Sequence, residues 1–180
     1  MRSICATLCV GLMVLAGLVA CSDEEEKSIP AHTEAEELWI TQNQAYFQER
    51  KAAVEENGQL LYRQLVVEDD TLLYRVLEAG LSDSVPTIHS DAKVSILGIL
   101  PVSKDQIVGD SKGNPIEMTL DLDSPELIKG LAVLLLRSCK GERVETIIPY
   151  QLGYGEHNYP QPYIPLCSTL QFTITVKGFE

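Results

Sequence analysis

The stretch IPYQLGYGE, residues 148–156, leads from an apolar run through a proline into a turn that holds Tyr154 between two glycines. A proline-rich loop follows, and the chain returns through Ile164-Pro165 to a segment of strict alternation at residues 168–177. Every second side chain of that segment is apolar, namely Leu170, Phe172, Ile174 and Val176. Alternation with a period of two predicts a β-strand with one buried face.

Two more segments upstream, residues 92–100 and 116–122, also predict strands, and the turn-rich residues 101–115 predict a loop between them. Ser124-Pro125 is a typical helix start, because a hydroxyl cap precedes a proline, and Gly141 is a typical stop. One face of the predicted helix is apolar and consists of Leu127, Ile128, Leu131, Leu134 and Leu135.

A longer helix is predicted over residues 33–58, where Thr33 and Glu36 form a capping box and Asn57-Gly58 would end the helix. Its apolar stripe is interrupted, so the helix is expected to rest on the edge of the domain or on a partner. Two aromatic residues of the stripe, Trp39 and Tyr46, are either docking anchors within the chain or part of a dimer seam.

The segment between the long helix and the first alternating strand contains the sequence LLYR twice, at residues 60–63 and 72–75. An acidic turn, residues 68–70, separates the two copies, which predicts two paired strands. The resulting order of elements is that of an α+β domain in which an antiparallel sheet wraps on one short helix, preceded by an N-terminal helix.

The order and spacing of these motifs over residues 72–180 resemble those of FKBP-type peptidyl-prolyl cis-trans isomerases. The resemblance implies an FKBP-like domain over residues 59–180 that accelerates rotation about X–Pro bonds without metal or cofactor. The motifs that carry it are the first strand at residue 72, Val94 and Gly98, Asp110, Leu127-Ile128 with Gly130, the turn at 148–155, Ile164-Pro165 and residues 169–172.

The resemblance also implies roles for individual residues. Tyr154 would donate its hydroxyl to the substrate carbonyl, Ile128 would offer its backbone N–H, and Asp110 would make a polar contact at the pocket edge. The side chains expected around the proline ring are Leu127, Leu131, Ile116, Met118, Ile164, Phe172 and Ile96. The sequence carries no zinc-ligand cluster, no phosphate loop and no G-x-S-x-G motif, and its three histidines are scattered.

Three positions depart from the family pattern: Ile96, Gly109 and Leu131 stand where the family has aromatic residues. The loss of aromatic walls predicts a shallower or reshaped pocket, and Gly109 is expected to loosen the loop that carries Asp110. Two functions therefore remain open, a prolyl isomerase with a degenerate site and a non-catalytic module that binds peptides or a partner protein. A structural protein of the cell envelope is a third reading.

Several polar features allow a simple structural explanation beside the functional one. Asp110 is a turn-capping carboxylate or a site residue. The acidic group at residues 121–126 lacks the ligand number and spacing of a calcium loop, so helix capping explains it better. Cys139 and Cys167 could form a disulfide in an oxidising compartment or remain two free thiols.

The N-terminus predicts a targeting segment, because Arg2 precedes an apolar run that ends in Leu18-Val19-Ala20-Cys21. This ending resembles the lipobox of bacterial lipoproteins, which implies that residues 1–20 are removed and Cys21 receives a lipid. The acidic residues 22–26 would then be a disordered tether or a surface-export signal, within an acidic tether at residues 21–32. The expected location is the cell envelope, at the outer membrane, with surface exposure open.

The chain of 180 residues has a formal net charge of −12 at pH 7, which argues against nucleic acid as a partner. The expected partners are proline-containing polypeptides and, through the lipid, a membrane. The oligomeric state is left open by the sequence.

Overall fold

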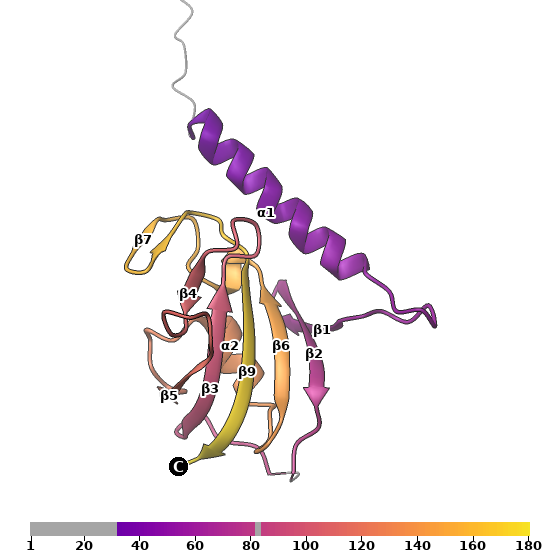
Figure 1. Ribbon diagram of the computed structural model, residues 1–180, viewed down its shortest axis with the longest axis vertical. Helices are drawn as coiled ribbons and strands as arrows, with labels where there is room; N and C mark the ends of the chain where they lie inside the picture. Colours follow the sequence, from indigo (N-terminus) through magenta and orange to yellow (C-terminus); the bar gives the residue numbers. More distant parts are fainter. Residues whose placement is uncertain (1–31, 82–83) are drawn as a thin grey trace, which may run out of the picture. The chain divides into compact units, whose positions relative to one another are not determined.

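The computed structural model describes residues 32–81 and 84–180 (Figure 1). The predicted signal segment, Cys21 and the tether up to residue 31 lie outside these residues. Within the described ranges, no helix is both long and apolar enough to cross a membrane.

The described chain contains two α-helices, a short 3₁₀ helix and nine strands. In chain order the elements are α1 (Glu34–Ala52), β1 (Arg63–Val67), β2 (Asp70–Glu78), β3 (Asp91–Ile99), β4 (Gln106–Val108), β5 (Ile116–Asp121), α2 (Lys129–Leu135), β6 (Arg143–Ile148), η1 (Tyr150–Leu152), β7 (Tyr159–Pro160), β8 (Tyr163–Ile164) and β9 (Leu170–Phe179).

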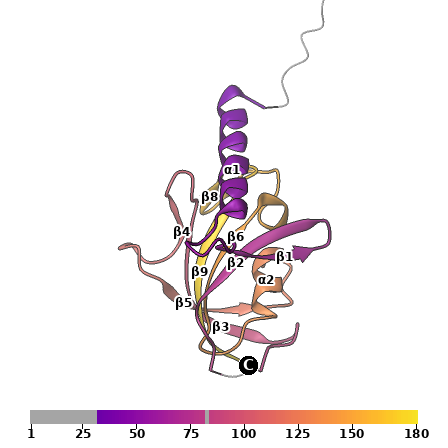
Figure 2. The ribbon, with the colours of Figure 1, turned by 90° about the vertical axis from the view of Figure 1, so that its right-hand side faces the viewer.

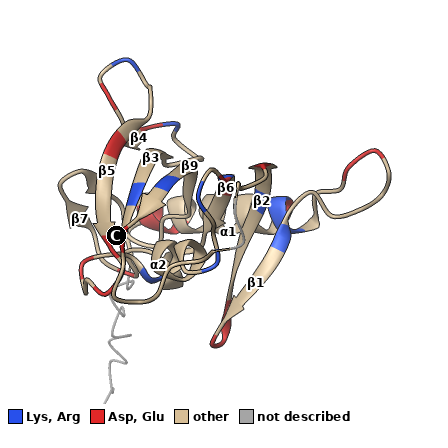
Figure 3. Ribbon diagram, turned by 90° about the horizontal axis from the view of Figure 1, so that it is seen from below, with Lys and Arg blue, Asp and Glu red and all other residues tan. Residues whose placement is uncertain are grey.

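Seven of these strands form one antiparallel sheet in the order β1-β2-β6-β9-β3-β4, with β5 paired to the other part of β3 (Figure 1). The strand β9 lies between β6 and β3, and its alternating apolar side chains are buried as predicted. The α+β class and the antiparallel sheet are therefore confirmed. The predicted hairpin is also present: β1 pairs with β2 across the acidic turn, where Figure 3 shows Asp and Glu together.

The two helices contact side chains that point to opposite faces of β9. In Figure 2, α1 rises above the upper end of the sheet, and α2 lies lower, beside the sheet. On one face Phe172 and Ile174 belong to the main core, together with Leu131 and Leu134 of α2. On the other face the hydroxyl of Tyr46 in α1 donates to Gln171 Oε1 at 2.8 Å. A smaller apolar cluster lies beneath the second half of α1 and consists of Phe47, Tyr62, Leu73 and Ile147.

The helix α1 begins as predicted and ends earlier than predicted. The capping box of Thr33 and Glu36 is present, with both reciprocal hydrogen bonds. The helix stops at Ala52, because Ala53 is extended and Val54 pairs with Leu60 instead of continuing the helix. The sequence at residues 57–58 forms the turn of this small hairpin rather than a helix C-terminus.

The helix α2 is also shorter than the sequence predicts. Ser124 caps a local turn, in which its Oγ accepts from the backbone N–H of Glu126 at 3.3 Å, and this turn does not continue into the helix. Ile128 is extended (φ −58°, ψ 137°) and is the residue that precedes the helix. The helical part therefore starts at Lys129 and ends at Leu135, well before Gly141.

A buried polar group joins three strands on the face of the sheet that α1 covers. The side chain of Glu145 in β6 accepts from Tyr62 Oη at 2.5 Å, from Arg75 Nε at 3.0 Å and from Gln171 Nε2 at 3.2 Å. The carboxylate is thus paired with a cation and hydrogen-bonded at both oxygens, as a buried charge requires. Elsewhere in the fold, Cys139 and Cys167 are both free thiols.

Candidate functional site

A cavity of about 360 Å³ opens between the inner face of the sheet, α2 and the turn after η1. Its lining side chains are mostly apolar, with a few polar groups from β5 and from the segment that joins β5 to α2. The lining residues are Ile96, Val108, Met118, Thr119, Leu120, Asp121, Ser124, Glu126, Leu127, Ile128, Leu131, Tyr154 and Phe172.

The structure brings seven of the ten pocket residues expected from the sequence to the wall of this cavity: Ile96, Met118, Leu127, Ile128, Leu131, Tyr154 and Phe172. The other three lie elsewhere. Ile164 is fully buried in the main core, and Ile116 is half-buried beside Ile96 in the β3–β5 ladder. Asp110 lies in the loop between β4 and β5, where its side chain is bonded to its own loop.

The turn that carries Tyr154 is fixed by backbone hydrogen bonds. The N–H groups of Gly153 and Gly155 both donate to Tyr150 O, at 3.0 and 2.9 Å, and Gly155 has the left-handed φ of +74° that a glycine adopts without strain. The ring of Tyr154 packs on Tyr159 with a centroid distance of 4.6 Å. Burial raises the pKa of Tyr154, so at neutral pH its hydroxyl is protonated and can donate a hydrogen bond.

Ile128 offers a second donor because it immediately precedes α2, where backbone N–H groups have no partner within the helix. Among the described residues, no acceptor is found for its N–H. The close approach of α2 to the Tyr154 turn depends on Gly130, whose Cβ would lie 2.6 Å from Ile148 Cγ2 and 3.1 Å from Leu152 O. Two hydrogen-bond donors, the Tyr154 hydroxyl and the Ile128 N–H, therefore lie beside one apolar cavity.

The inner end of the cavity is formed by Phe172, which is 2% exposed. Its ring packs directly against the backbone of Gly98 in β3, the residue paired with it across the sheet. A side chain at position 98 would occupy the space of the ring, so the glycine allows the aromatic ring to approach the strand closely.

The side chain of Asp110 holds its own loop in place through hydrogen bonds. Its Oδ1 accepts from the backbone N–H of Lys112 at 2.8 Å and of Asn114 at 2.7 Å, and its Oδ2 accepts from Asn114 Nδ2 at 2.9 Å. The hydrogen bond from the Asn114 side chain is the main reason that the pKa of Asp110 is lowered. These bonds correspond to the turn-capping alternative for this residue.

Gly109 has a left-handed φ of +147°, and a Cβ there would meet Gln106 and Leu97 at 2.8 Å. The loop conformation therefore requires a glycine at this position. The preceding residue, Val108, supplies an apolar side chain to the cavity wall.

Sequence reasoning missed several residues of the site. Leu120 could have been found, because it shares the inner face of β5 with Met118 by alternation. Val108 and Tyr159 carry no local signal, since one lies in a three-residue strand and the other in the two-residue strand β7, which the tertiary fold brings to Tyr154.

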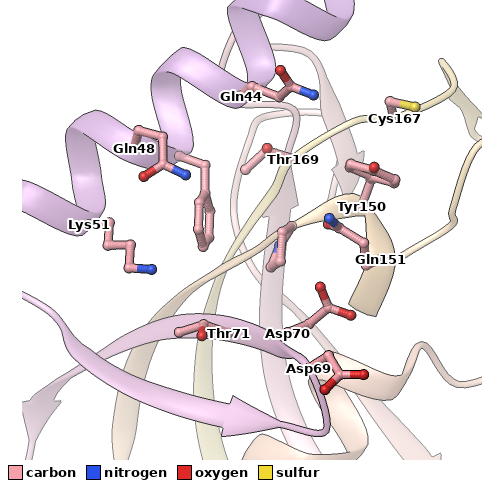
Figure 4. Close-up of a pocket in the computed structure, with 12 residues that line it drawn as sticks. Gln44, Gln48, Lys51, Asp69, Asp70, Thr71, Tyr150, Gln151, Cys167 and Thr169 are labelled. Carbon is pink, nitrogen blue, oxygen red and sulfur yellow. The ribbon is translucent and has the colours of Figure 1, made fainter.

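A second cavity, of about 370 Å³, lies between α1, the turn at the start of β2 and η1 (Figure 4). Charged and amide side chains lie on both of its sides: Gln44, Gln48 and Lys51 come from α1, and they face Asp69, Asp70 and Gln151. An apolar proline ring is better accommodated by the cavity at Tyr154, where aliphatic and aromatic side chains form the walls.

No cluster of three or more potential metal ligands is found in the part of the chain that the structure describes.

Comparison with known proteins agrees with this arrangement. A family model described as FKBP-type peptidyl-prolyl cis-trans isomerase matches residues 84–177, just over half of the chain. A probable FKBP-type peptidyl-prolyl cis-trans isomerase of Haemophilus influenzae is 33% identical over 105 residues, which cover 58% of this chain and 41% of that protein.

Two solved structures share the fold. FkpA from Escherichia coli superposes with a TM-score of 0.61 at 26% identity, over 81% of this chain and 63% of FkpA. A peptidyl-prolyl cis-trans isomerase from Pseudomonas syringae gives a TM-score of 0.64 at 20% identity, over 85% of this chain and 99% of that one. The chain spans about two fifths of the length of the curated relatives it matches.

Proposed function

Because this chain belongs to the family of FKBP-type peptidyl-prolyl cis-trans isomerases, we propose that it catalyses cis–trans isomerisation of X–Pro bonds in polypeptides. The observation that carries the proposal is the apolar cavity closed by Phe172 and Leu131, with the Tyr154 hydroxyl and the Ile128 N–H beside it. Metal and cofactor have no role in the proposed reaction.

The reaction needs little from the protein beyond this environment. Resonance keeps the peptide bond planar and sets a barrier of about 18–20 kcal/mol, and the twisted state that crosses the barrier has lost that resonance. The twisted amide is less polar than the planar one, so an apolar cavity that excludes water favours it relative to the ground state. No covalent bond is made or broken.

Each part of the site has a distinct role in this proposal. Ile96, Leu131 and Phe172 surround the proline ring. The Tyr154 hydroxyl and the Ile128 N–H donate hydrogen bonds to carbonyl groups of the substrate, which hold the chain on either side of the bond that rotates.

The proposal extends to the location of the protein. The Leu18-Val19-Ala20-Cys21 sequence supports removal of residues 1–20 and lipid attachment at Cys21. The protein would then be anchored in the cell envelope, at the outer membrane or the cell surface, and would assist folding of exported proteins. Cys21→Ser should abolish incorporation of a labelled fatty acid, whereas continued incorporation would contradict lipidation at this residue.

A second function, binding of proline-containing peptides without catalysis, is favoured by two observations. The cavity has aliphatic walls at Ile96 and Leu131, and the Asp110 carboxylate is engaged by its own loop. A weak active site and a pure binding site differ only in whether the bound X–Pro bond rotates faster.

The decisive experiment measures cis-to-trans conversion of short X–Pro peptides by the purified protein. Tyr154→Phe removes one neutral hydrogen bond, worth about 0.5–1.5 kcal/mol, and should lower kcat/KM by about 2- to 10-fold. Tyr163→Phe is the matched control, because Tyr163 is exposed on the neighbouring hairpin, and it should leave the rate unchanged. A rate no higher than the uncatalysed background, with several residues before proline, would refute the isomerase.

A further inference from the structure

One polar side chain of α1 is buried in the contact between the helix and the rest of the domain. Asn43 is 1% exposed, and its Oδ1 accepts from the backbone N–H of Thr169 at 2.8 Å. Its own backbone carbonyl accepts from Thr169 Oγ1 at 3.2 Å, and its Nδ2 donates to Trp39 O at 2.9 Å. Thr169 is therefore held by α1 through both its backbone and its side chain, and Figure 4 shows it beneath the helix.

One helical turn earlier, α1 holds the adjacent residue of the same segment. The indole Nε1 of Trp39 donates to Ser168 Oγ at 3.2 Å, and this hydroxyl donates to Pro165 O at 2.6 Å. Two residues of α1 thus fix residues 165–169, the segment that connects β8 to β9.

The segment in turn holds the turn that carries Tyr154. The backbone N–H of Cys167 donates to Gly155 O at 2.9 Å. Cys167 has a left-handed φ of +54°, which is uncommon for a residue other than glycine, and it is buried. A conformation of this kind persists only where neighbouring contacts hold it, and the contacts on its C-terminal side are those from Trp39 and Asn43.

A second connection leads from the segment to the ring that packs on Tyr154. The backbone N–H of Leu166 donates to Asn158 Oδ1 at 3.0 Å, and Asn158 precedes Tyr159 in the chain. The segment that α1 fixes is therefore hydrogen-bonded to Gly155, which follows Tyr154, and to Asn158, which precedes the Tyr159 ring that packs on Tyr154.

The attachment of α1 does not itself require a buried asparagine. Phe47 already packs the helix into an apolar cluster on the sheet. An apolar side chain at position 43 would add to this packing, but it would leave the buried N–H of Thr169 without an acceptor. What the amide adds is a directional bond that fixes the position of one backbone N–H.

We infer that Asn43 and Trp39 are positioning residues of the cavity: α1 holds residues 165–169 so that the turn keeps Tyr154 at the cavity wall. This inference rests on the proposed isomerase function for its catalytic consequence, whereas its structural part can be tested alone. The N-terminal helix is accordingly a support of the site and not merely a spacer that precedes the domain.

The test uses hydrogen exchange and kinetics on the purified protein with Asn43→Ala and Trp39→Phe. The amide of Cys167 should exchange at least about 10-fold faster in Asn43→Ala and less so in Trp39→Phe, while amides of the β3–β9 ladder keep their protection. The catalytic readout is kcat/KM, which should fall by about 3- to 10-fold through kcat at a temperature where the variants remain folded.

The matched control is Tyr46→Phe, because it removes a hydrogen bond from the same helix to β9 rather than to residues 165–169. It should leave Cys167 exchange and kcat unchanged. A further readout is non-additivity: in the Asn43→Ala background, Tyr154→Phe should have a smaller effect on kcat than it has alone.

The outcomes separate the two proposals. Absence of isomerase activity in the unmutated protein would refute the proposed function, and Cys167 exchange would still decide whether α1 holds the turn. Unchanged Cys167 exchange in both variants, or an equal increase in Tyr46→Phe, would overturn the inference. If Asn43→Ala does not fold, Trp39→Phe and Ser168→Ala apply the same criteria, since each removes hydrogen bonds of this segment while Asn43 stays in place.

Discussion

Replacing Gly98 with alanine should displace the ring of Phe172, which forms the inner end of the cavity. Gly98 is paired with Phe172 across the β3–β9 ladder, and a Cβ at position 98 would lie 2.5 Å from Cε1 and 2.7 Å from Cδ1 of the ring. It would also lie 3.2 Å from Ile107 Cγ1. Because Phe172 is 2% exposed and surrounded by the core, its ring can move only by displacing other buried side chains or by entering the cavity.

Two opposing effects set the change in the free energy of unfolding of Gly98→Ala. Overpacking a close-packed core costs about 1–3 kcal/mol, whereas glycine-to-alanine in a strand recovers about 0.5–1 kcal/mol of conformational entropy. The free energy of unfolding should therefore fall, by up to about 2.5 kcal/mol. Gly178→Ala is the matched control in the neighbouring strand, because its Cβ would meet no atom within 4 Å, and its stability should not decrease.

The assay is denaturant unfolding of both variants, combined with a double-mutant cycle. Phe172→Leu removes the ring atoms that the new Cβ would meet. It should therefore lower the free energy of unfolding by less in the Gly98→Ala background than in the unmutated protein, with a coupling energy of about 1 kcal/mol or more. The displaced ring should also lower kcat/KM for X–Pro peptides. Equal stability of Gly98→Ala and Gly178→Ala, or additive effects in the cycle, would refute this description of the contact.

Two other predictions concern polar groups. If Asp110 is a loop cap, Asp110→Asn keeps an acceptor for the two backbone N–H groups and should retain isomerase activity within about 2-fold. Asp110→Ala removes this acceptor and should lose more activity. An equal loss of activity in both variants would indicate that the carboxylate contacts substrate. Tyr62→Phe removes the hydroxyl bonded to Glu145 and should destabilise the protein by about 1.5–3 kcal/mol in denaturant unfolding. Burial, together with the hydrogen bond to Glu145 and its negative charge, raises the pKa of Tyr62, so the unfolded chain loses this proton at lower pH than the folded protein. Stability should therefore fall as pH rises above about 10, and Tyr62→Phe should show a shallower fall; identical pH profiles would contradict the raised pKa.

Much of the fold could be predicted from the sequence because its strands are strongly patterned. The alternation from Leu170 to Val176 reflects one buried face, and a period of two allows little ambiguity. The capping box at Thr33 is equally local, since its four residues contain the whole interaction.

Helix ends were less predictable, because tertiary contacts decided them. Asn57-Gly58 is a good helix terminator and an equally good hairpin turn, and the bridge between Val54 and Leu60 selects the second. Ser124-Pro125 resembles a helix start, yet the extended conformation of Ile128 delays α2 to Lys129.

Site residues that alternate along a strand could be predicted from the sequence, whereas residues that loops contribute to the cavity wall could not. Gly109 suggested a missing wall, but the backbone conformation requires the glycine, and the preceding Val108 lines the cavity. The sequence does not distinguish Asn43 from other polar residues of the helix, because its role depends on a backbone N–H more than a hundred residues away in the chain.

The central claim is that the Tyr154 cavity binds X–Pro peptides and accelerates their isomerisation. The most direct measurement follows a proline peptide and the methyl groups of the labelled protein together by NMR exchange spectroscopy. We predict cis–trans exchange peaks that are absent without protein, together with saturable shifts of the methyl groups of Leu127, Ile128 and Leu131. Peptide exchange at the uncatalysed rate, or shifts confined to residues outside this cavity, would contradict the account.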